Sequence, residues 1–193
     1  PPGNGLMIHR HQRRRGQADS NVAVPLIEIG YNMHRKKHIS CGIMIILIVA
    51  FDQITKYFAE KNLADGKIVS FLPGFVQFRY AQNTGMAFSM LSGARWIFVV
   101  ITIIVCGGVM WFLFSNRAKN LWVYWSLGVV LAGGVGNLID RARFGYVVDF
   151  IEPTFVNFAV FNIADCAVTC GAAVLVVYLL IDAFKKDKCD GDE

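Results

Sequence analysis

The chain has 193 residues, of which 55% are apolar and only 17% are charged, and its mean hydropathy is +0.46. A soluble domain carries about a quarter charged residues, so this composition excludes an ordinary soluble protein and indicates one compact membrane bundle. The formal charge of +5 does not indicate nucleic-acid binding, because the basic residues gather at the ends of apolar runs.

Residues 1–38 are polar and basic and differ from the rest of the chain. Met33, directly before a basic stretch, is a candidate natural start. We interpret 1–38 as a cytoplasmic N-terminal extension, either non-native or disordered, and leave the first ~32 residues out of the fold prediction.

Four apolar runs follow, at about 41–59, 96–114, 121–139 and 163–181. At about 1.5 Å per residue, each run is long enough to cross most of the ~30 Å hydrocarbon core as a helix. Because lipid offers the backbone no hydrogen-bond partner, such spans must be helical. The sequence therefore predicts a membrane domain over 39–185 with four helices, followed by a cytoplasmic tail at 186–193.

The distribution of lysine and arginine predicts the orientation of these helices. Basic clusters lie before the first run at 35–37, between the second and third runs at 117–119, and after the fourth run at 185–188. We therefore expect these ends and both termini in the cytoplasm, and the segments 60–94 and 140–162 on the outer side.

The first outer segment carries signals for β-structure. Residues 67–72 follow an Asp-Gly turn and residues 75–80 follow a Pro-Gly turn, a pattern that predicts two strands. The segment 146–161 is mostly apolar around Asp149 and a Glu-Pro-Thr turn. We expect both outer segments to lie against the bilayer surface.

The positions of the histidines and cysteines limit the chemistry. All four histidines lie within 1–38, which excludes Ser-His-Asp triads, Ser-His dyads and HExxH metalloproteases. Cys166 and Cys170 share a helix face, yet no histidine or third cysteine lies near enough in the sequence to complete a zinc site. We therefore expect no metal and no cofactor.

Two aspartates, Asp149 and Asp165, lie on the predicted outer side, and Asp165 stands at the start of an apolar run, where a charge is costly. Taken singly, Asp149 could be an ordinary loop carboxylate and Asp165 a first-turn residue favoured by the helix dipole. Two carboxylates in one low-dielectric site share a proton, so one can deprotonate water while the other protonates the leaving group. The pair predicts an aspartic peptidase.

Other polar residues gather on the same side. Asp52 and Lys56 are four residues apart, so they can form an ion pair on one helix face, which we interpret as structural. Asn137, Asp140 and Arg141 fall on roughly one face at the end of the third run, after a glycine-rich stretch that favours close helix packing.

Five blocks of sequence, taken in order, resemble the lipoprotein signal peptidases, which are the type II signal peptidases of bacterial membranes. The blocks are DQITK at 52–56, NTGMAF at 83–88, GGVGNLIDR at 133–141, VDF at 148–150 and FNIAD at 161–165. The resemblance covers about 40–185. It implies an all-α membrane protein of four transmembrane helices, with a small extracytoplasmic β-cradle and a short helix.

The resemblance also implies roles for individual residues. Asp149 and Asp165 would be the catalytic pair of an intramembrane aspartic endopeptidase. The residues that bind substrate or inhibitor would be Asn83, Gly85, Asn137, Arg141 and Asn162, and the supporting residues would be Asp52, Lys56 and Asp140.

The substrate implied by the resemblance is a diacylglyceryl-modified prolipoprotein, cut just before its lipidated cysteine. Membrane lipids and a globomycin-type inhibitor would be further partners, and nucleic acid would not. The location would be the bacterial cytoplasmic (inner) membrane, crossed several times, with the active site on the outer face.

Three other interpretations use the same residues. A small proton-coupled membrane transporter would use Asp52, Asp149 and Asp165 as a relay, although the acidic residues gather at one face and no internal repeat is visible. A peptidase built on a serine and a lysine would need Lys56 as its base, but the neighbouring Asp52 favours a charged lysine. In a structural membrane protein the aspartates would be dispensable.

Overall fold

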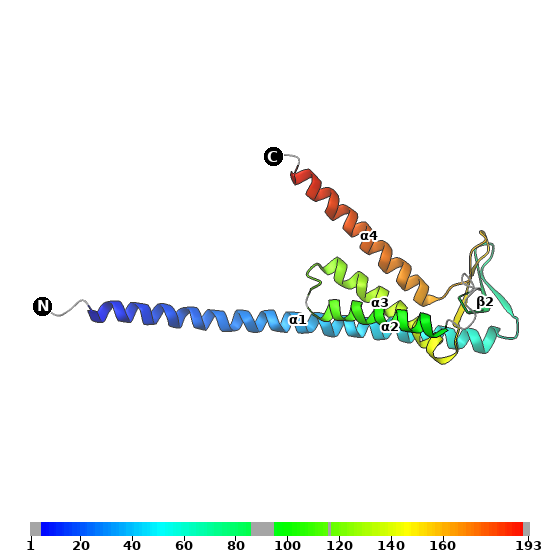
Figure 1. The fold of residues 1–193 in the computed structure, drawn as a ribbon, viewed down its shortest axis with the longest axis horizontal. Coiled ribbons are helices and arrows are strands. Elements are labelled where there is room, and N and C mark those ends of the chain that lie inside the picture. Colours follow the sequence, from blue (N-terminus) through cyan, green and yellow to red (C-terminus); the bar gives the residue numbers. More distant parts are fainter. Residues whose placement is uncertain (1–4, 86–94, 116, 191–193) are drawn as a thin grey trace. The chain divides into compact units, whose positions relative to one another are not determined.

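The computed structural model describes residues 5–85, 95–115 and 117–190 (Figure 1). Along the chain its elements are α1 (Gly5–Leu63), β1 (Ile68–Leu72), β2 (Val76–Asn83), α2 (Arg95–Phe114), α3 (Leu121–Arg143), β3 (Val147–Pro153) and α4 (Ile163–Asp190). Residues 86–88 of the second sequence block, and 191–193 of the predicted tail, lie outside the described residues.

Within the described residues, four stretches of helix are long and apolar enough to cross a bilayer. They are Arg35–Leu63, Trp96–Phe114, Leu121–Arg143 and Ile163–Lys185. Each contains one of the four predicted apolar runs. The predicted fold class, four transmembrane helices with a small sheet, is therefore confirmed. The described residues outside these helices contain no short helix, which was the remaining part of that prediction.

The chain divides into two compact units, Pro1–Ser40 and Cys41–Glu193. The described residues of the first unit, from Gly5 onward, are helical. This unit nearly coincides with the predicted extension at 1–38, whose origin stays a prediction. The second unit contains the sheet and every residue that the sequence analysis assigned to the site.

Glycines of α3 allow α1 and α4 to come very close to this helix. A Cβ atom on Gly133 would lie 2.3 Å from the carbonyl oxygen of Ala164 on α4, and one on Gly136 would lie 2.6 Å from Asp52 Oδ2 on α1. Real side chains essentially never make contacts this short. Small residues commonly let membrane helices approach each other in this way, and here they bring polar residues of three helices together.

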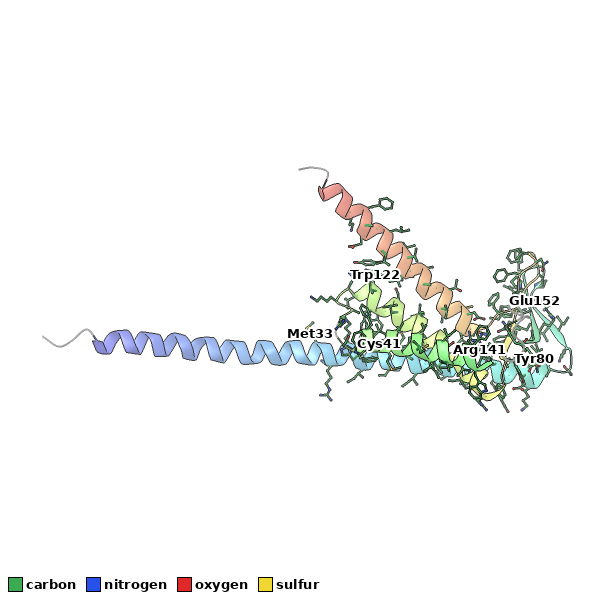
Figure 2. All side chains as sticks on the ribbon, in the orientation of Figure 1. Met33, Cys41, Tyr80, Trp122, Arg141 and Glu152 are labelled. Carbon is green, nitrogen blue, oxygen red and sulfur yellow. The ribbon has the colours of Figure 1, made fainter. Side chains whose placement is uncertain are left out.

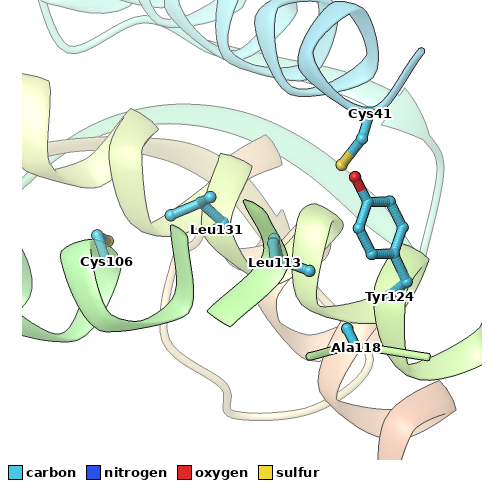
Figure 3. Close-up of a cluster of buried hydrophobic side chains, with 6 residues drawn as sticks. All are labelled: Cys41, Cys106, Leu113, Ala118, Tyr124 and Leu131. Atoms are coloured by element: carbon cyan, nitrogen blue, oxygen red, sulfur yellow. The ribbon is translucent and has the colours of Figure 1, made fainter. Parts of the chain in front are cut away.

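A buried apolar cluster joins α1, α2 and α3 (Figure 3). Its members are Cys41, Cys106, Leu113, Ala118, Tyr124 and Leu131. The Tyr124 hydroxyl points toward the sulfur of Cys41, and the tyrosine is fully buried. Because lipid tails are as apolar as these side chains, the cluster stabilises the bundle mainly through close van der Waals packing.

The three strands form one antiparallel sheet in the order β1-β2-β3. The strands predicted at 67–72 and 75–80 correspond to β1 and β2. Gly74 between them has a φ of +80°, a conformation that suits glycine in a tight turn.

The third strand, β3, is an addition to the predicted elements, since 146–161 was expected only to lie on the bilayer surface. β3 pairs with β2 so that Asp149 lies opposite Ala81, next to a register shift between Phe78 and Ala81. Its first four residues, 147–150, are all buried. The pairing with β2 therefore places Asp149 inside the protein, at the end of the sheet that adjoins the helices.

Candidate active site

Asp149 is held on β3 by two asparagine amides. Asn83 Nδ2 donates to Asp149 Oδ2 at 2.9 Å, and Asn162 Nδ2 donates to Asp149 Oδ1 at 2.6 Å. Asn83 ends β2, and its own Oδ1 accepts a hydrogen bond from the Gly85 N–H at 2.9 Å. Gly85 has a φ of +84°, which L side chains rarely adopt. The turn after β2 thus orients Asn83 toward Asp149.

Asp165 belongs to the first turn of α4 and forms a reciprocal capping box with Asn162. The Asp165 backbone N–H donates to Asn162 Oδ1 at 2.9 Å, and the Asn162 backbone N–H donates to Asp165 Oδ2 at 3.2 Å. This arrangement satisfies two backbone donors that a helix start leaves unpaired. The first-turn interpretation of Asp165 is therefore correct for its local structure, and it does not conflict with a chemical role.

Two buried asparagines join the carboxylates into one network. Asn162 hydrogen-bonds to both of them. Its Nδ2 donates to Asp149, and its Oδ1 and backbone N–H form the capping box with Asp165. Asn137 Nδ2 donates to Asp165 Oδ1 at 2.8 Å, while Asn137 Oδ1 accepts from Asn162 Nδ2 at 3.1 Å. Asp149 and Asp165, which come from a strand and a helix, are thereby fixed close to each other.

The pKa of the Asp149 carboxyl is raised from 3.8 to about 6, mainly by burial. The negative charge of Asp165 also raises it, while hydrogen bonds from Asn83 and Asn162 and the charge of Lys56 lower it. Burial penalises the charged form of a carboxyl, and a second carboxylate adds repulsion. A carboxyl with this pKa can hold a proton near neutral pH, as a general acid must.

A buried ion cluster lies behind the two carboxylates. The predicted pair of Asp52 and Lys56 is present at 2.8 Å, and Lys56 Nζ also contacts Asp140 Oδ2 at 2.9 Å. Asp52 Oδ1 accepts the Ala164 N–H at 2.9 Å, and Asp140 Oδ2 accepts the Val148 N–H at 3.1 Å. Ala164 and Val148 directly precede the two carboxylates in sequence, so the cluster anchors the backbone of both.

A cavity of about 630 Å³ opens beside Asp149. Its wall includes Asn83, Gly85 and Arg141, three of the residues assigned to substrate binding. Figure 2 marks Arg141 on α3 and Glu152 on β3 in this part of the molecule. Apolar wall residues come from α2 and from the segment 157–160. Such a mixture of apolar surface and a few polar groups is typical of ligand sites.

An ion pair crosses from β2 to β3 in the wall of this cavity. Arg79 Nε and Nη2 donate to the Glu152 carboxylate at 2.9 and 2.8 Å, and Gln77 Nε2 donates to it at 2.7 Å. The hydrogen bond with Arg79 is the main cause that lowers the pKa of Glu152, and it raises the pKa of Arg79. Because Arg79 is half-exposed, the pair contributes little to stability, but it keeps both charges at the wall.

The predicted site residues occupy two kinds of position. Asn137 and Asn162 are buried behind the carboxylates, and the cavity wall that the described residues form does not include them. Arg141 and Asn83 do line the cavity. Gln53 also joins this network, through its bond to Asp140 Oδ1 at 2.9 Å, and its place in the first sequence block is the only signal for it in the sequence.

The sequence and the structure were each compared with known proteins, and the two comparisons agree. A family model described as signal peptidase (SPase) II matches residues 44–181. The chain is 43% identical over 135 residues to the lipoprotein signal peptidase of Streptococcus pyogenes serotype M5 (strain Manfredo), which covers 70% of this chain and 89% of that protein. A similar protein of serotype M3 (strain SSI-1) is 42% identical over the same shares.

Two solved structures that resemble this chain are described as bacterial membrane enzymes. One, determined by the in meso method at 2.3 Å resolution, has a TM-score of 0.70 and 34% sequence identity, covering 76% of this chain and 91% of the other. A second, at 1.9 Å resolution, has a TM-score of 0.69 and 34% identity, covering 73% and 92%.

Proposed function

Because the chain belongs to the signal peptidase II family, and is thus a membrane peptidase that removes signal peptides from prolipoproteins, we propose that Asp149 and Asp165 are its catalytic pair. The observation that carries this proposal is the position of Asn162, whose side chain bonds to Asp149 while its cap holds Asp165. Two carboxylates held by one asparagine, of which Asp149 lines a cavity, can share the work of general acid and general base.

We assign the shared proton to Asp149. Asp149 is almost fully buried, and its pKa of about 6 favours the protonated form more than that of an ordinary aspartate does. Asp165 is more exposed and accepts hydrogen bonds from Asn137 Nδ2 and the Asn162 N–H. Donors of this kind stabilise a carboxylate, so Asp165 is the base that receives a proton from water.

In the first step, the water oxygen forms a bond to the scissile carbonyl carbon while Asp165 takes the water proton. Protonated Asp149 donates a hydrogen bond to the carbonyl oxygen, where negative charge develops. In the second step, the carbon–nitrogen bond breaks and the leaving amine receives a proton from the pair. The products are a free carboxyl on the signal peptide and a free amino group on the cysteine, and both aspartates return to their starting state.

We propose that the cavity beside Asp149 receives the peptide segment around the scissile bond of a diacylglyceryl-modified prolipoprotein. Asn83, Gly85 and Arg141 would hold its backbone, and membrane lipid would surround the acyl chains of a substrate that arrives laterally. A cyclic peptide inhibitor of the globomycin type would compete for the same cavity.

We further propose that the active site faces the outer side of a bacterial cytoplasmic membrane, with both termini in the cytoplasm. The sheet connects α1 to α2 and α3 to α4, so the pair and the cavity lie at one end of the bundle. The basic clusters at 35–37, 117–119 and 185–188 belong to the opposite ends of the same helices, and such clusters favour the cytoplasm.

Single amide substitutions test the catalytic pair. Asp149→Asn and Asp165→Asn should each abolish release of the signal peptide from a lipidated prolipoprotein, since an amide keeps the shape but cannot carry the proton. Asp65→Asn, the same change at an exposed carboxylate, serves as the matched control and should cleave normally. Turnover like that of the wild type in either pair variant would refute the aspartic mechanism.

Cysteine labelling from each side of the membrane tests the orientation. Single cysteines at Asp65 and Glu152 should react with an impermeant reagent from outside, and cysteines at Lys119 and Lys186 only after the membrane is opened. Labelling of the Glu152 position from the cytoplasmic side would overturn the proposed location of the site.

A further inference from the structure

Lys56 on α1 carries a buried ammonium group, and each of its N–H donors has a partner in the protein. Its Nζ lies 2.8 Å from Asp52 Oδ2, 2.9 Å from Asp140 Oδ2 and 3.0 Å from Asn137 Oδ1. An ammonium has three N–H donors and no acceptor, so these three partners use its full capacity. The side chain is 3% exposed, which leaves water little access to replace a partner.

The contact with Lys56 determines which way the Asn137 amide points. Asn137 Oδ1 accepts from Lys56 and from Asn162 Nδ2, so Asn137 Nδ2 is left to donate to Asp165 Oδ1 at 2.8 Å. A flipped amide would place its NH₂ group against two donors and its oxygen against the Asp165 carboxylate. Unmatched buried polar groups are costly, so a donor-only ammonium selects a single orientation of the amide.

We propose that Lys56 is a positioning residue for the reaction: through the amide of Asn137, it keeps a hydrogen-bond donor aimed at Asp165. This inference rests on the proposed catalytic pair. On this proposal, the ion cluster on α1 and α3 does more than join the two helices. It also selects the hydrogen bond from Asn137 that stabilises Asp165, the general base.

Several charged groups face Lys56 and must be considered in any test. They are Asp52 on α1, Asp140 on α3, Asp149 on β3, Asp165 beyond Asn137 on α4, and Glu60 and Arg143, which line a cavity of about 70 Å³ with Lys56. Removing the ammonium alone would leave two buried carboxylates unpaired, a change that often prevents folding. The test variant should therefore remove a charge of each sign.

The principal test is the double variant Lys56→Gln with Asp52→Asn, assayed on a lipidated prolipoprotein. A glutamine can turn either end of its amide toward Asn137, so it no longer selects one orientation. We expect kcat to fall about 10- to 100-fold, the worth of one hydrogen bond to a charged group, with KM nearly unchanged. The acid limb of the pH–kcat profile should move to higher pH, because the ionised carboxylate pair loses a hydrogen-bond donor.

Gln53→Met is the matched control. Gln53 donates to Asp140 Oδ1 at 2.9 Å and to the Gly136 carbonyl at 3.2 Å, so its loss weakens the same cluster while the Lys56–Asn137 contact stays. The control should lower the melting temperature and leave the pH–kcat profile in place. A shift of the profile equal to that of the double variant would overturn the inference, since general loosening would then explain both.

Asn137→Asp is a second test, which remains available if the double variant does not fold. The carboxylate still accepts from Lys56 and Asn162 but has no donor for Asp165, so it should reproduce the fall in kcat and the shifted acid limb. Normal kcat in Asn137→Asp, or in a folded double variant, would overturn the inference, as would a change in KM alone. If Asp165→Asn itself cleaved normally, the proposed catalytic pair would fail instead.

Discussion

Asp149→Asn should remove activity and at the same time stabilise the folded protein at neutral pH. The raised pKa of Asp149 means that its contribution to stability is fully present below the unfolded pKa of 3.8 and is lost as pH rises through about 6. The difference between these pKa values corresponds to ~3 kcal/mol. An asparagine does not titrate, so the variant escapes this loss.

The hydrogen bonds of the site reduce the stability that Asp149→Asn gains, by an amount that does not depend on pH. Asn83 Nδ2 and Asn162 Nδ2 both donate to Asp149, whereas an asparagine at this position offers one oxygen and one NH₂ group. One donor is then left facing another, at a cost of about 1–2 kcal/mol. We expect the variant to be less stable than the wild type at pH 4 and about 1–2 kcal/mol more stable at pH 8.

The assay is unfolding of both proteins in detergent micelles at several values of pH between 4 and 8. The informative quantity is the difference in stability between variant and wild type, because the titration of all other groups cancels in it. Between pH 4 and pH 8 this difference should increase by about 2.5 kcal/mol, and the matched difference for Asp65→Asn should stay flat. A difference for Asp149→Asn that does not change with pH would refute the reasoning that burial raises the pKa of Asp149.

Three further predictions concern neighbouring positions. Asp165→Asn removes a negative charge beside Asp149, so the pKa of Asp149 should fall below about 6. When Asp165→Asn is already present, adding Asp149→Asn should therefore give a smaller gain in stability as pH rises. Gly136→Ala adds a Cβ 2.6 Å from Asp52 Oδ2 and should cost about 1–3 kcal/mol together with activity; an unchanged melting curve would contradict the close packing. Arg141→Lys keeps the charge and loses the planar fork, so a globomycin-type inhibitor should bind about tenfold more weakly at equal thermal stability, and equal affinity would remove Arg141 from the binding wall.

Much of the helical fold could be predicted from the sequence, because long uncharged runs have only one stable form in lipid. The ion pair of Asp52 and Lys56 follows from helical spacing alone. The strand β3 could not be predicted in this way. It is a short apolar run whose periodicity fits a strand or a buried helix equally, and its partner β2 lies far away in the sequence.

The detailed roles in the site depend on contacts between distant elements. Asn162 can be placed at a helix start from the sequence, but its bond to Asp149 requires β3 to pass beside α4. The donation from Lys56 to Asn137 joins residues 81 positions apart. Glu152 carries no local sign that Arg79 will pair with it, because cross-strand neighbours are defined only once the sheet exists.

The buried asparagines also limit how this protein could escape an inhibitor that fills the cavity. Asn162 serves Asp149, Asn137 and the start of α4 at once, so a substitution there that weakened a drug would also disable cleavage. Ala159 and Val160 form part of the same cavity wall with small apolar side chains. Resistance mutations should therefore collect in the segment 157–160, and a compound anchored on Asp149 and Asn83, which line the cavity, should meet resistance less readily than one that depends on this segment.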